Sequence, residues 1–120
     1  MHLVFVTKYR RGALTDAILS DCENIMANVC QDFGCTLVEF NGEEDYVHLL
    51  VHFPATVQIS RLVNSLKGVS SRYLRRDHAK HINNYLWNGH LWSRSYYAAT
   101  AGGAPLSTIA TYIQSQRRPA

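Results

Sequence analysis

The chain has little charge, few cysteines and no long apolar segment. Of its 120 residues only 18% are charged and 47% are hydrophobic, a balance that excludes an intrinsically disordered chain. Its longest apolar runs, such as residues 47–53, fall far short of the roughly 20 residues of a membrane-spanning helix. The first residues also lack the basic region and the apolar stretch of a signal peptide. We therefore expect a single compact domain, residues 1–120, in the cytoplasm.

The three cysteines are odd in number and show no C-x-x-C spacing, which disfavours a disulfide framework or a zinc site. Cys22 and Cys30 fall on the apolar stripe of a predicted helix and are interpreted as core residues. The net charge of +3 gives a mild preference for polyanions that many enzymes share. The placement of the charges therefore matters more than their sum.

Apolar periodicity predicts the element order β-α-β-β-α-β-α. Strands are expected over residues 2–7, 35–40, 46–53 and 91–100, with a hairpin loop over 41–45. Helices are expected over residues 16–33, 59–74 and 105–117, with Gly34 ending the first and Gly102-Gly103 preceding the last. This order is that of a ferredoxin-like split βαβ fold: an α+β protein with a four-stranded antiparallel sheet, two helices on one face, and an added C-terminal helix.

The strand predicted at residues 46–53 has an unusual polar face. Alternation assigns Val47, Leu49, Val51 and Phe53 to the core and Tyr46, His48, Leu50 and His52 to the other face. Side chains two residues apart start about 6.6 Å from each other and can reach one metal ion, whereas those four apart start about 13 Å from each other and cannot. Tyr46 and His48 are thus candidate ligands. A His and a Tyr that merely pack on a half-buried face are the structural alternative.

The predicted C-terminal helix carries a second candidate pair. Tyr112 and Gln116 are four residues apart, so they lie on one ridge of the helix. Phosphodiester cleavage needs a nucleophile and a cation on the phosphate oxygens, and a phenol beside an amide oxygen offers a nucleophile and a ligand. The alternative is a boundary tyrosine that covers the edge of the core.

Motifs spread over essentially the whole chain point to one family when they are taken together. They are His-Leu-Val-Phe-Val-Thr-Lys-Tyr-Arg-Arg at 2–11, Val-Glu-Phe-Asn-Gly-Glu at 38–43, Asp-Tyr-Val-His-Leu-Leu-Val at 45–51, Leu-Lys-Gly-Val-Ser-Ser-Arg at 66–72, Leu-Trp-Ser-Arg-Ser-Tyr-Tyr at 91–97, and Tyr-Ile-Gln-Ser-Gln at 112–116. In this combination the chain resembles the single-strand transposases of the insertion-sequence-200/605 family, which use one catalytic tyrosine and a His-hydrophobic-His motif.

The resemblance implies a mechanism and a set of site residues. Tyr112 would be the nucleophile that forms a 5′-phosphotyrosine with single-stranded DNA, and His48 and Gln116 would bind Mg²⁺ or Mn²⁺. It also implies recognition of a DNA hairpin at the element's end, and a homodimer in which the C-terminal helix of one subunit completes the active site of the other.

DNA binding is expected from basic side chains in two places. The loop after the first strand carries Lys8, Arg10 and Arg11, and the second helix carries Lys67 and Arg72. Phosphate contacts from such residues position DNA and make its affinity fall with salt. The chain would then be found at the nucleoid when bound to DNA.

One departure from the family pattern leaves alternatives open. Tyr46 stands where the family has the first His, and a neutral phenol is a poorer ligand for Mg²⁺ or Mn²⁺ than an imidazole. The alternatives are a degenerate transposase that binds hairpin DNA without efficient cleavage, and a non-catalytic nucleic-acid-binding module on the same fold. His2, His78, His81 and His90 show no ligand spacing and are expected to be surface residues.

Overall fold

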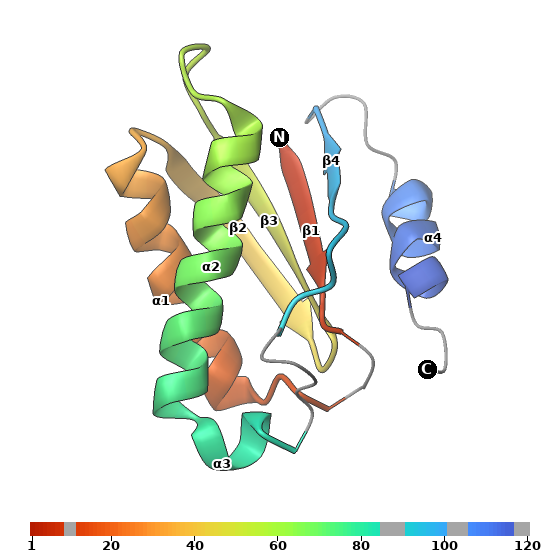
Figure 1. Ribbon diagram of the computed structural model, residues 1–120. Helices are drawn as coiled ribbons and strands as arrows, with labels where there is room; N and C mark the ends of the chain where they lie inside the picture. The colour runs from red at the N-terminus through yellow and green to blue at the C-terminus, as the bar shows by residue number, and fades with distance from the viewer. Residues whose placement is uncertain (9–11, 85–90, 101–105, 117–120) are drawn as a thin grey trace.

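The computed structural model describes residues 1–8, 12–84, 91–100 and 106–116 (Figure 1). Its elements are, in order, β1 (His2–Val6), α1 (Asp16–Asp32), β2 (Thr36–Glu43), β3 (Tyr46–His52), α2 (Ile59–Asp77), α3 (Ala79–Ile82), β4 (Tyr97–Ala99) and α4 (Leu106–Gln116). Within these residues, no helix is both long enough and apolar enough to cross a membrane.

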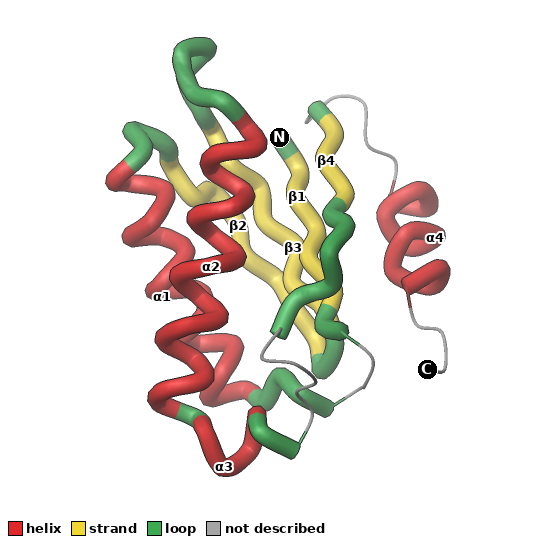
Figure 2. Tube along the Cα trace, in the orientation of Figure 1, coloured by secondary structure: helices red, strands yellow, loops and turns green. Residues whose placement is uncertain are grey.

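The strands form one antiparallel sheet in the order β2-β3-β1-β4, with α1 and α2 on one face (Figures 1 and 2). Strands β1 and β2 are connected through α1 and lie on either side of β3. Strands β3 and β4 are connected through α2 and α3 and lie on either side of β1. This is the split βαβ arrangement, so the predicted fold is confirmed. The helix-covered face holds the main core, in which Leu3, Phe5 and Leu49 are fully buried.

Local sequence explains where α1 begins and ends. The Thr15 hydroxyl accepts a hydrogen bond from the amide of Ile18 and so caps the first turn. Gly34 follows the helix with a φ of 73°, a left-handed conformation that glycine adopts without a steric penalty. The helix presents Cys22 and Cys30 to the core, where burial raises the pKa of the Cys22 thiol to about 12. Both are core residues, as predicted.

The hairpin between β2 and β3 is tighter than predicted. We expected a loop over residues 41–45, but the ladder runs through Asn41, Gly42 and Glu43, so Glu44 and Asp45 alone make the turn. Asp45 is nevertheless buried, and its carbonyl accepts hydrogen bonds from the amide and the hydroxyl of Thr7. These tertiary bonds favour a two-residue turn over the longer loop that the polar sequence indicates.

The fourth strand is shorter than predicted and is interrupted. Trp92 forms an isolated bridge with Thr7, but the regular ladder begins only at Tyr97. The amide of Ser93 still donates to the carbonyl of Val6, but residues 94–96 are not part of the ladder, and groups of Ser93 and Ser95 contact α2 and α4. A short helix, α3, also occupies the segment after α2, where we expected only a polar connection.

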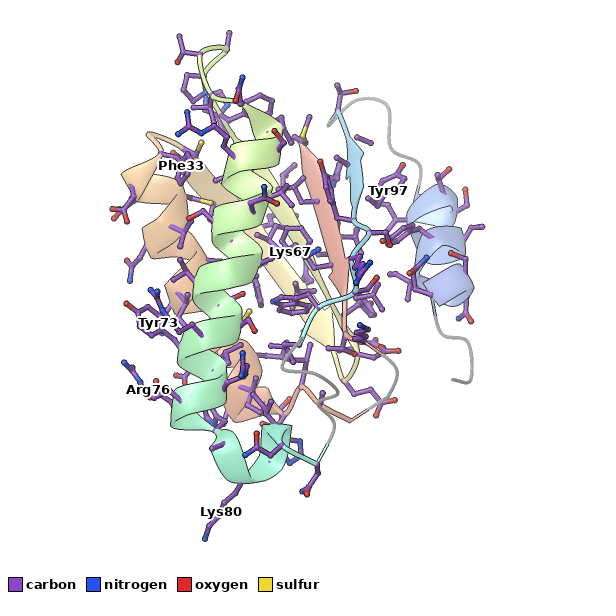
Figure 3. The ribbon with its side chains drawn as sticks, viewed as in Figure 1. Phe33, Lys67, Tyr73, Arg76, Lys80 and Tyr97 are labelled. Carbon is purple, nitrogen blue, oxygen red and sulfur yellow. The ribbon has the colours of Figure 1, made fainter. Side chains whose placement is uncertain are left out.

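The helix α4 packs on the face of the sheet opposite to α1 and α2. Ile109 and Ile113 form a small buried cluster with Val4 and Val6 of β1, whose side chains alternate with the main-core residues Leu3 and Phe5. Tyr97 of β4 points toward this helix (Figure 3). The second apolar face of β1 therefore fixes α4 against the sheet. The predicted break at Gly102-Gly103 and the predicted helix start at Pro105 lie outside the described residues.

Candidate active site and nucleic-acid interface

The predicted nucleophile and amide ligand meet at a serine. The hydroxyl oxygens of Tyr112 and Ser95 are 2.9 Å apart, and the Ser95 hydroxyl donates to Oε1 of Gln116 over 3.2 Å. Because a hydroxyl carries one proton, the neutral phenol must then donate to Ser95. Ser93 donates a longer bond of 3.4 Å to the same Gln116 oxygen. Residues from α4 and from the segment before β4 thus form one polar cluster.

Tyr112 is half-buried at this cluster. Its ring centroid lies 5.6 Å from that of Tyr97, and the ring packs against the apolar contact between α4 and β1. Burial raises the pKa of the Tyr112 phenol, and the hydrogen bond with Ser95 acts in the opposite direction. The phenol is therefore protonated at neutral pH in this arrangement.

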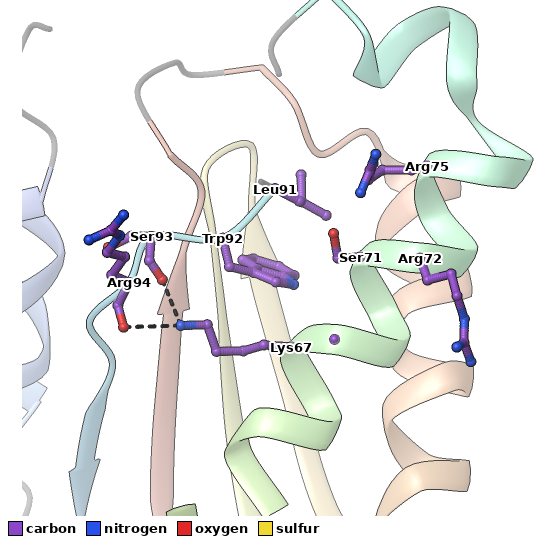
Figure 4. A pocket seen from close by; sticks show the side chains of 9 residues that line it. Lys67, Ser71, Arg72, Arg75, Leu91, Trp92, Ser93 and Arg94 are labelled. Atoms are coloured by element: carbon purple, nitrogen blue, oxygen red, sulfur yellow. Dashed lines mark hydrogen bonds between the residues drawn. The ribbon is translucent and has the colours of Figure 1, made fainter. Parts of the chain in front are cut away.

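Lys67 of α2 anchors the segment that carries Ser95. Its Nζ donates to the carbonyl of Ser93 over 2.6 Å and to that of Arg94 over 3.2 Å, as the dashed lines in Figure 4 show. Burial lowers the pKa of the Lys67 ammonium. The side chain that sequence reasoning assigned to DNA thus holds the main chain next to the candidate nucleophile.

His48 lies on the open face of β3, as the alternation predicts, and it contacts a residue we had not selected. Nε2 of His48 and Nδ1 of His2 are 2.8 Å apart, and the two rings are stacked with centroids 5.0 Å apart. The pKa of His48 is lowered by burial and by His2, against an opposing effect of Glu39. The expectation that His2 is a plain surface residue is wrong.

Tyr46 shares the open face with His48, and its ring packs against the cluster of Val4, Val6, Ile109 and Ile113. It lies next to the residues on which Tyr112 also packs. The Tyr46 ring thus contributes to the apolar contact that holds α4.

The predicted metal ligands fall into two groups on one face of the sheet. His48, Val4 and Tyr97 are Cα partners in one row across β3, β1 and β4, which places the α-carbons of His48 and Tyr97 about 10 Å apart. His48 pairs with His2, while Gln116 is bonded to Ser93 and Ser95. Among the described residues, no three His, Cys, Asp or Glu side chains converge in a way that could hold a metal ion.

A basic pocket of about 500 Å³ opens between α2 and the segment before β4 (Figure 4). Lys67, Arg72, Arg75 and Arg94 line it together with Trp92, and none of the described residues that line it is acidic. Arg72 and Arg76 also stand over the ring of Tyr73, at 5.0 and 4.8 Å from its centroid. A positively charged pocket with the exposed guanidinium group of Arg72 on one side is suited to phosphate groups.

The predicted DNA-binding residues have different positions in the structure. Arg72 is exposed at the pocket, whereas Lys67 is engaged by main-chain carbonyls. Lys8 is half-buried, and its amide donates to the carbonyl of Leu91. Arg10 and Arg11 lie outside the described residues.

Two other histidines have specific partners rather than a free surface position. His78 bonds to the carboxylate of Asp21 over 2.6 Å, and His81 bonds to the carbonyl of Gly12 over 2.7 Å. Both contacts connect the end of α2 and the start of α3 to the region around α1, which makes them structural. His90 is outside the described residues.

Sequence reasoning missed His2, Ser95 and Arg94 as site residues. The signal for the last two was available, because Ser-Arg-Ser interrupts an aromatic stretch where a regular strand would have apolar alternation. For His2 the signal was its place at the start of a strand that pairs with the strand of His48.

Comparison with known proteins identifies the family. A family model described as "Transposase IS200 like" matches residues 1–116. The chain belongs to this family. Transposases for insertion sequence element IS200 from Salmonella typhimurium and Salmonella typhi are each 30% identical to it over 115 residues, covering 96% of this chain and 74% of theirs. A crystal structure of a "putative transposase" from Deinococcus radiodurans R1 superposes with a TM-score of 0.87 at 32% identity, covering 99% of this chain and 90% of that one.

Membership in the IS200-like transposases gives the chain a transposase function, and with it DNA as the molecule it acts on. The match spans every element described above, from β1 to α4. The alternative of an unrelated nucleic-acid-binding module on the same fold is thereby set aside.

Proposed function

We propose that this IS200-like transposase cleaves and rejoins single-stranded DNA through a covalent 5′-phosphotyrosine on Tyr112. The observation that carries the proposal is the hydrogen-bonded series from Tyr112 through Ser95 to Gln116. It places a phenol and an amide oxygen together on the open face of the sheet, on a helix that packs against β1 through a small apolar cluster. The family match supports the proposal because it extends through this helix.

In the proposed step, the Tyr112 oxygen attacks the scissile phosphorus in line with the leaving 3′ oxygen. A bond forms between the phenolic oxygen and phosphorus, and the bond from phosphorus to the 3′ oxygen breaks. The phenol gives up its proton, and the departing 3′ oxygen gains one. The phosphotyrosine keeps the energy of the phosphodiester, so a second DNA end can be joined without a nucleotide cofactor.

The donors present suit Mg²⁺ or Mn²⁺, with His48 supplying an imidazole nitrogen and Gln116 an amide oxygen. When bound, such a cation would offset negative charge on the phosphate oxygens. Nε2 of His48 lies 2.8 Å from Nδ1 of His2, so its bond to the cation would replace this hydrogen bond. Gln116 must exchange its serine partners for the cation, which requires α4 to move or a second copy to supply it.

We propose a homodimer in which α4 of one subunit completes the site of the other. Within this subunit Tyr112 and Gln116 are held by Ser95, about two strands away from His48. Of the side chains described in α4, only Ile109 and Ile113 are buried; they pack on Val4 and Val6, with the partly buried rings of Tyr46, Tyr97 and Tyr112 around them. A helix attached in this way can be repositioned at modest cost.

The DNA contacts are assigned to the basic pocket between α2 and the segment before β4. Arg72, Arg75 and Arg94 line it, and we propose that they bind the backbone of a DNA hairpin at the element's end. Lys8, Arg10 and Arg11 follow β1 in the sequence and are assigned to DNA in the same proposal, although Arg10 and Arg11 lie outside the described residues.

The test is a covalent adduct. The protein is incubated with labelled single-stranded DNA that carries the element's own end, with Mg²⁺ or Mn²⁺, and analysed by denaturing electrophoresis. We expect a labelled protein–DNA species that is lost in Tyr112→Phe. It should be retained in the control Tyr96→Phe, which changes an exposed tyrosine in the segment before β4. An adduct that survives Tyr112→Phe would refute the assignment of the nucleophile.

A second candidate is a transposase copy that binds hairpin DNA but cleaves it poorly. The observation that favours it is the packing of the partly buried Tyr46 ring against the apolar cluster under α4, since a neutral phenol is a weak cation ligand. In this case wild-type protein binds the DNA and forms little adduct, and Tyr46→His increases both Mn²⁺ affinity and adduct formation. Equal Mn²⁺ affinity and equal adduct formation in the two proteins would rule it out.

A further inference from the structure

We propose that His2 is a metal ligand, and that it supplies the second imidazole which Tyr46 does not provide. The inference concerns the cation site of the proposed function and rests on it. It starts from the contact between Nδ1 of His2 and Nε2 of His48, which are 2.8 Å apart. The two histidines are 46 residues apart in the sequence, so only the pairing of β1 with β3 brings them together.

The two nitrogens have the spacing that a shared ion requires. Two imidazole nitrogens bound to one cation at about 2.1 Å, with a near-right angle between the bonds, are about 3.0 Å apart. A hydrogen bond between two imidazoles holds one proton between two lone pairs, and a divalent cation can take the place of that proton. With the centroids 5.0 Å apart and the nitrogens 2.8 Å apart, one nitrogen of each ring already points at the other ring.

The surroundings of the pair favour a cation over an anion. Glu39 of the neighbouring strand β2 is the acidic group within electrostatic reach of His48. The residues paired with His48 across the sheet are Asn41 on β2 and Val4 on β1, neither of which carries a positive charge. An amide and a carboxylate on β2 can provide oxygen atoms beside the two nitrogens.

The strand register explains how His2 can act in place of a histidine at position 46. Tyr46 and His48 are two residues apart on one strand, whereas His2 lies on the adjacent strand, two residues from Val4, which is the Cα partner of His48. Both positions lie on the open face of the sheet and are similarly close to His48. The chain therefore retains a pair of imidazoles although its motif reads Tyr-Val-His.

The first experiment measures Mn²⁺ binding by the intact protein, using the electron paramagnetic resonance signal of free Mn²⁺. We expect His2→Gln to lower the affinity about tenfold or more, and His48→Gln to lower it at least as much. The matched control is His52→Gln, because His52 is an exposed residue on the same face of β3 and lies four residues from His48, too far to share an ion bound to His48. Affinity of His2→Gln within twofold of wild type overturns the proposal.

The second measurement uses wild-type protein and does not depend on the folding of a variant. Pulsed electron paramagnetic resonance of bound Mn²⁺ detects nitrogen nuclei in its coordination sphere, and we expect two imidazole nitrogens. One or none overturns the proposal. In the background of His2→Gln, Tyr46→His is expected to restore the second nitrogen and the lost affinity.

The adduct assay separates this inference from the proposed function. An adduct that depends on Tyr112, together with Mn²⁺ binding that is indifferent to His2, would overturn the ligand role and leave the function intact. Mn²⁺ binding that depends on His2, in a protein that forms no adduct under any condition, would support the ligand role and overturn the function.

Discussion

Replacing Lys67 with methionine distinguishes a structural lysine from a DNA-binding one. The ammonium donates bonds of 2.6 and 3.2 Å to the carbonyls of Ser93 and Arg94. Hydrogen bonds that involve a charged group contribute about 1.5–3 kcal/mol each before the cost of desolvating that group. The Lys67 side chain is only partly buried and burial already lowers its pKa, so we expect a net loss of about 1–2 kcal/mol in the free energy of unfolding for Lys67→Met.

Two assays measure the consequences of this substitution. Urea denaturation gives the loss of stability, and DNA binding as a function of salt gives the number of phosphate contacts. A side chain that neutralises one phosphate of single-stranded DNA contributes about 0.7 to the slope of log affinity against log salt. We expect Lys67→Met to leave this slope nearly unchanged, and the matched control Arg72→Met, five residues along the same helix and exposed, to reduce it by about that amount.

The same substitution is expected to slow formation of the covalent adduct, because the segment that positions Ser95 beside Tyr112 loses its anchor. The reasoning would be refuted by a Lys67→Met protein that is as stable as wild type and has a reduced salt slope. That combination would mean that the ammonium leaves the carbonyls and binds phosphate.

Further substitutions test other parts of the structure. Ser70→Ala removes the buried hydroxyl that accepts the indole N–H of Trp92 over 2.9 Å, so we expect a loss of about 1–3 kcal/mol in urea denaturation, and an unchanged midpoint would contradict this. Gly42→Ala would place a Cβ 2.7 Å from Leu19 and 2.9 Å from the carbonyl of Tyr46, and we expect about 1–3 kcal/mol of destabilisation, measured in the same way. Ser95→Ala removes the hydrogen bond that opposes the effect of burial on the pKa of Tyr112. We therefore expect the midpoint of the phenol titration, followed by carbon NMR of the ring, to move to higher pH. A shift to lower pH would show that Ser95 favours the neutral phenol.

The sequence determined the order of elements and the faces of most of them. The apolar residues alternate regularly over 46–53 and have helical spacing over 16–33 and 59–74. Only a strand in the first segment and helices in the other two bring these side chains to one buried face, and the structure has β3, α1 and α2 there. The same alternation placed Tyr46 and His48 together on the open face, and the four-residue spacing placed Tyr112 and Gln116 on one ridge. These are local relations, fixed by the geometry of one strand or one helix.

Only the tertiary structure decided how these local pairs are combined. Pairing of β1 with β3 brings His2 to His48, and the interruption of the fourth strand brings Ser95 to Tyr112 and the carbonyls of residues 93 and 94 to Lys67. Sequence periodicity relates residues within one strand or helix, so it cannot predict these contacts. Each contact joins two elements whose relative position depends on the whole sheet. The sequence by itself determined the chemistry that each element carries, and the packing of the elements determined which of those groups meet.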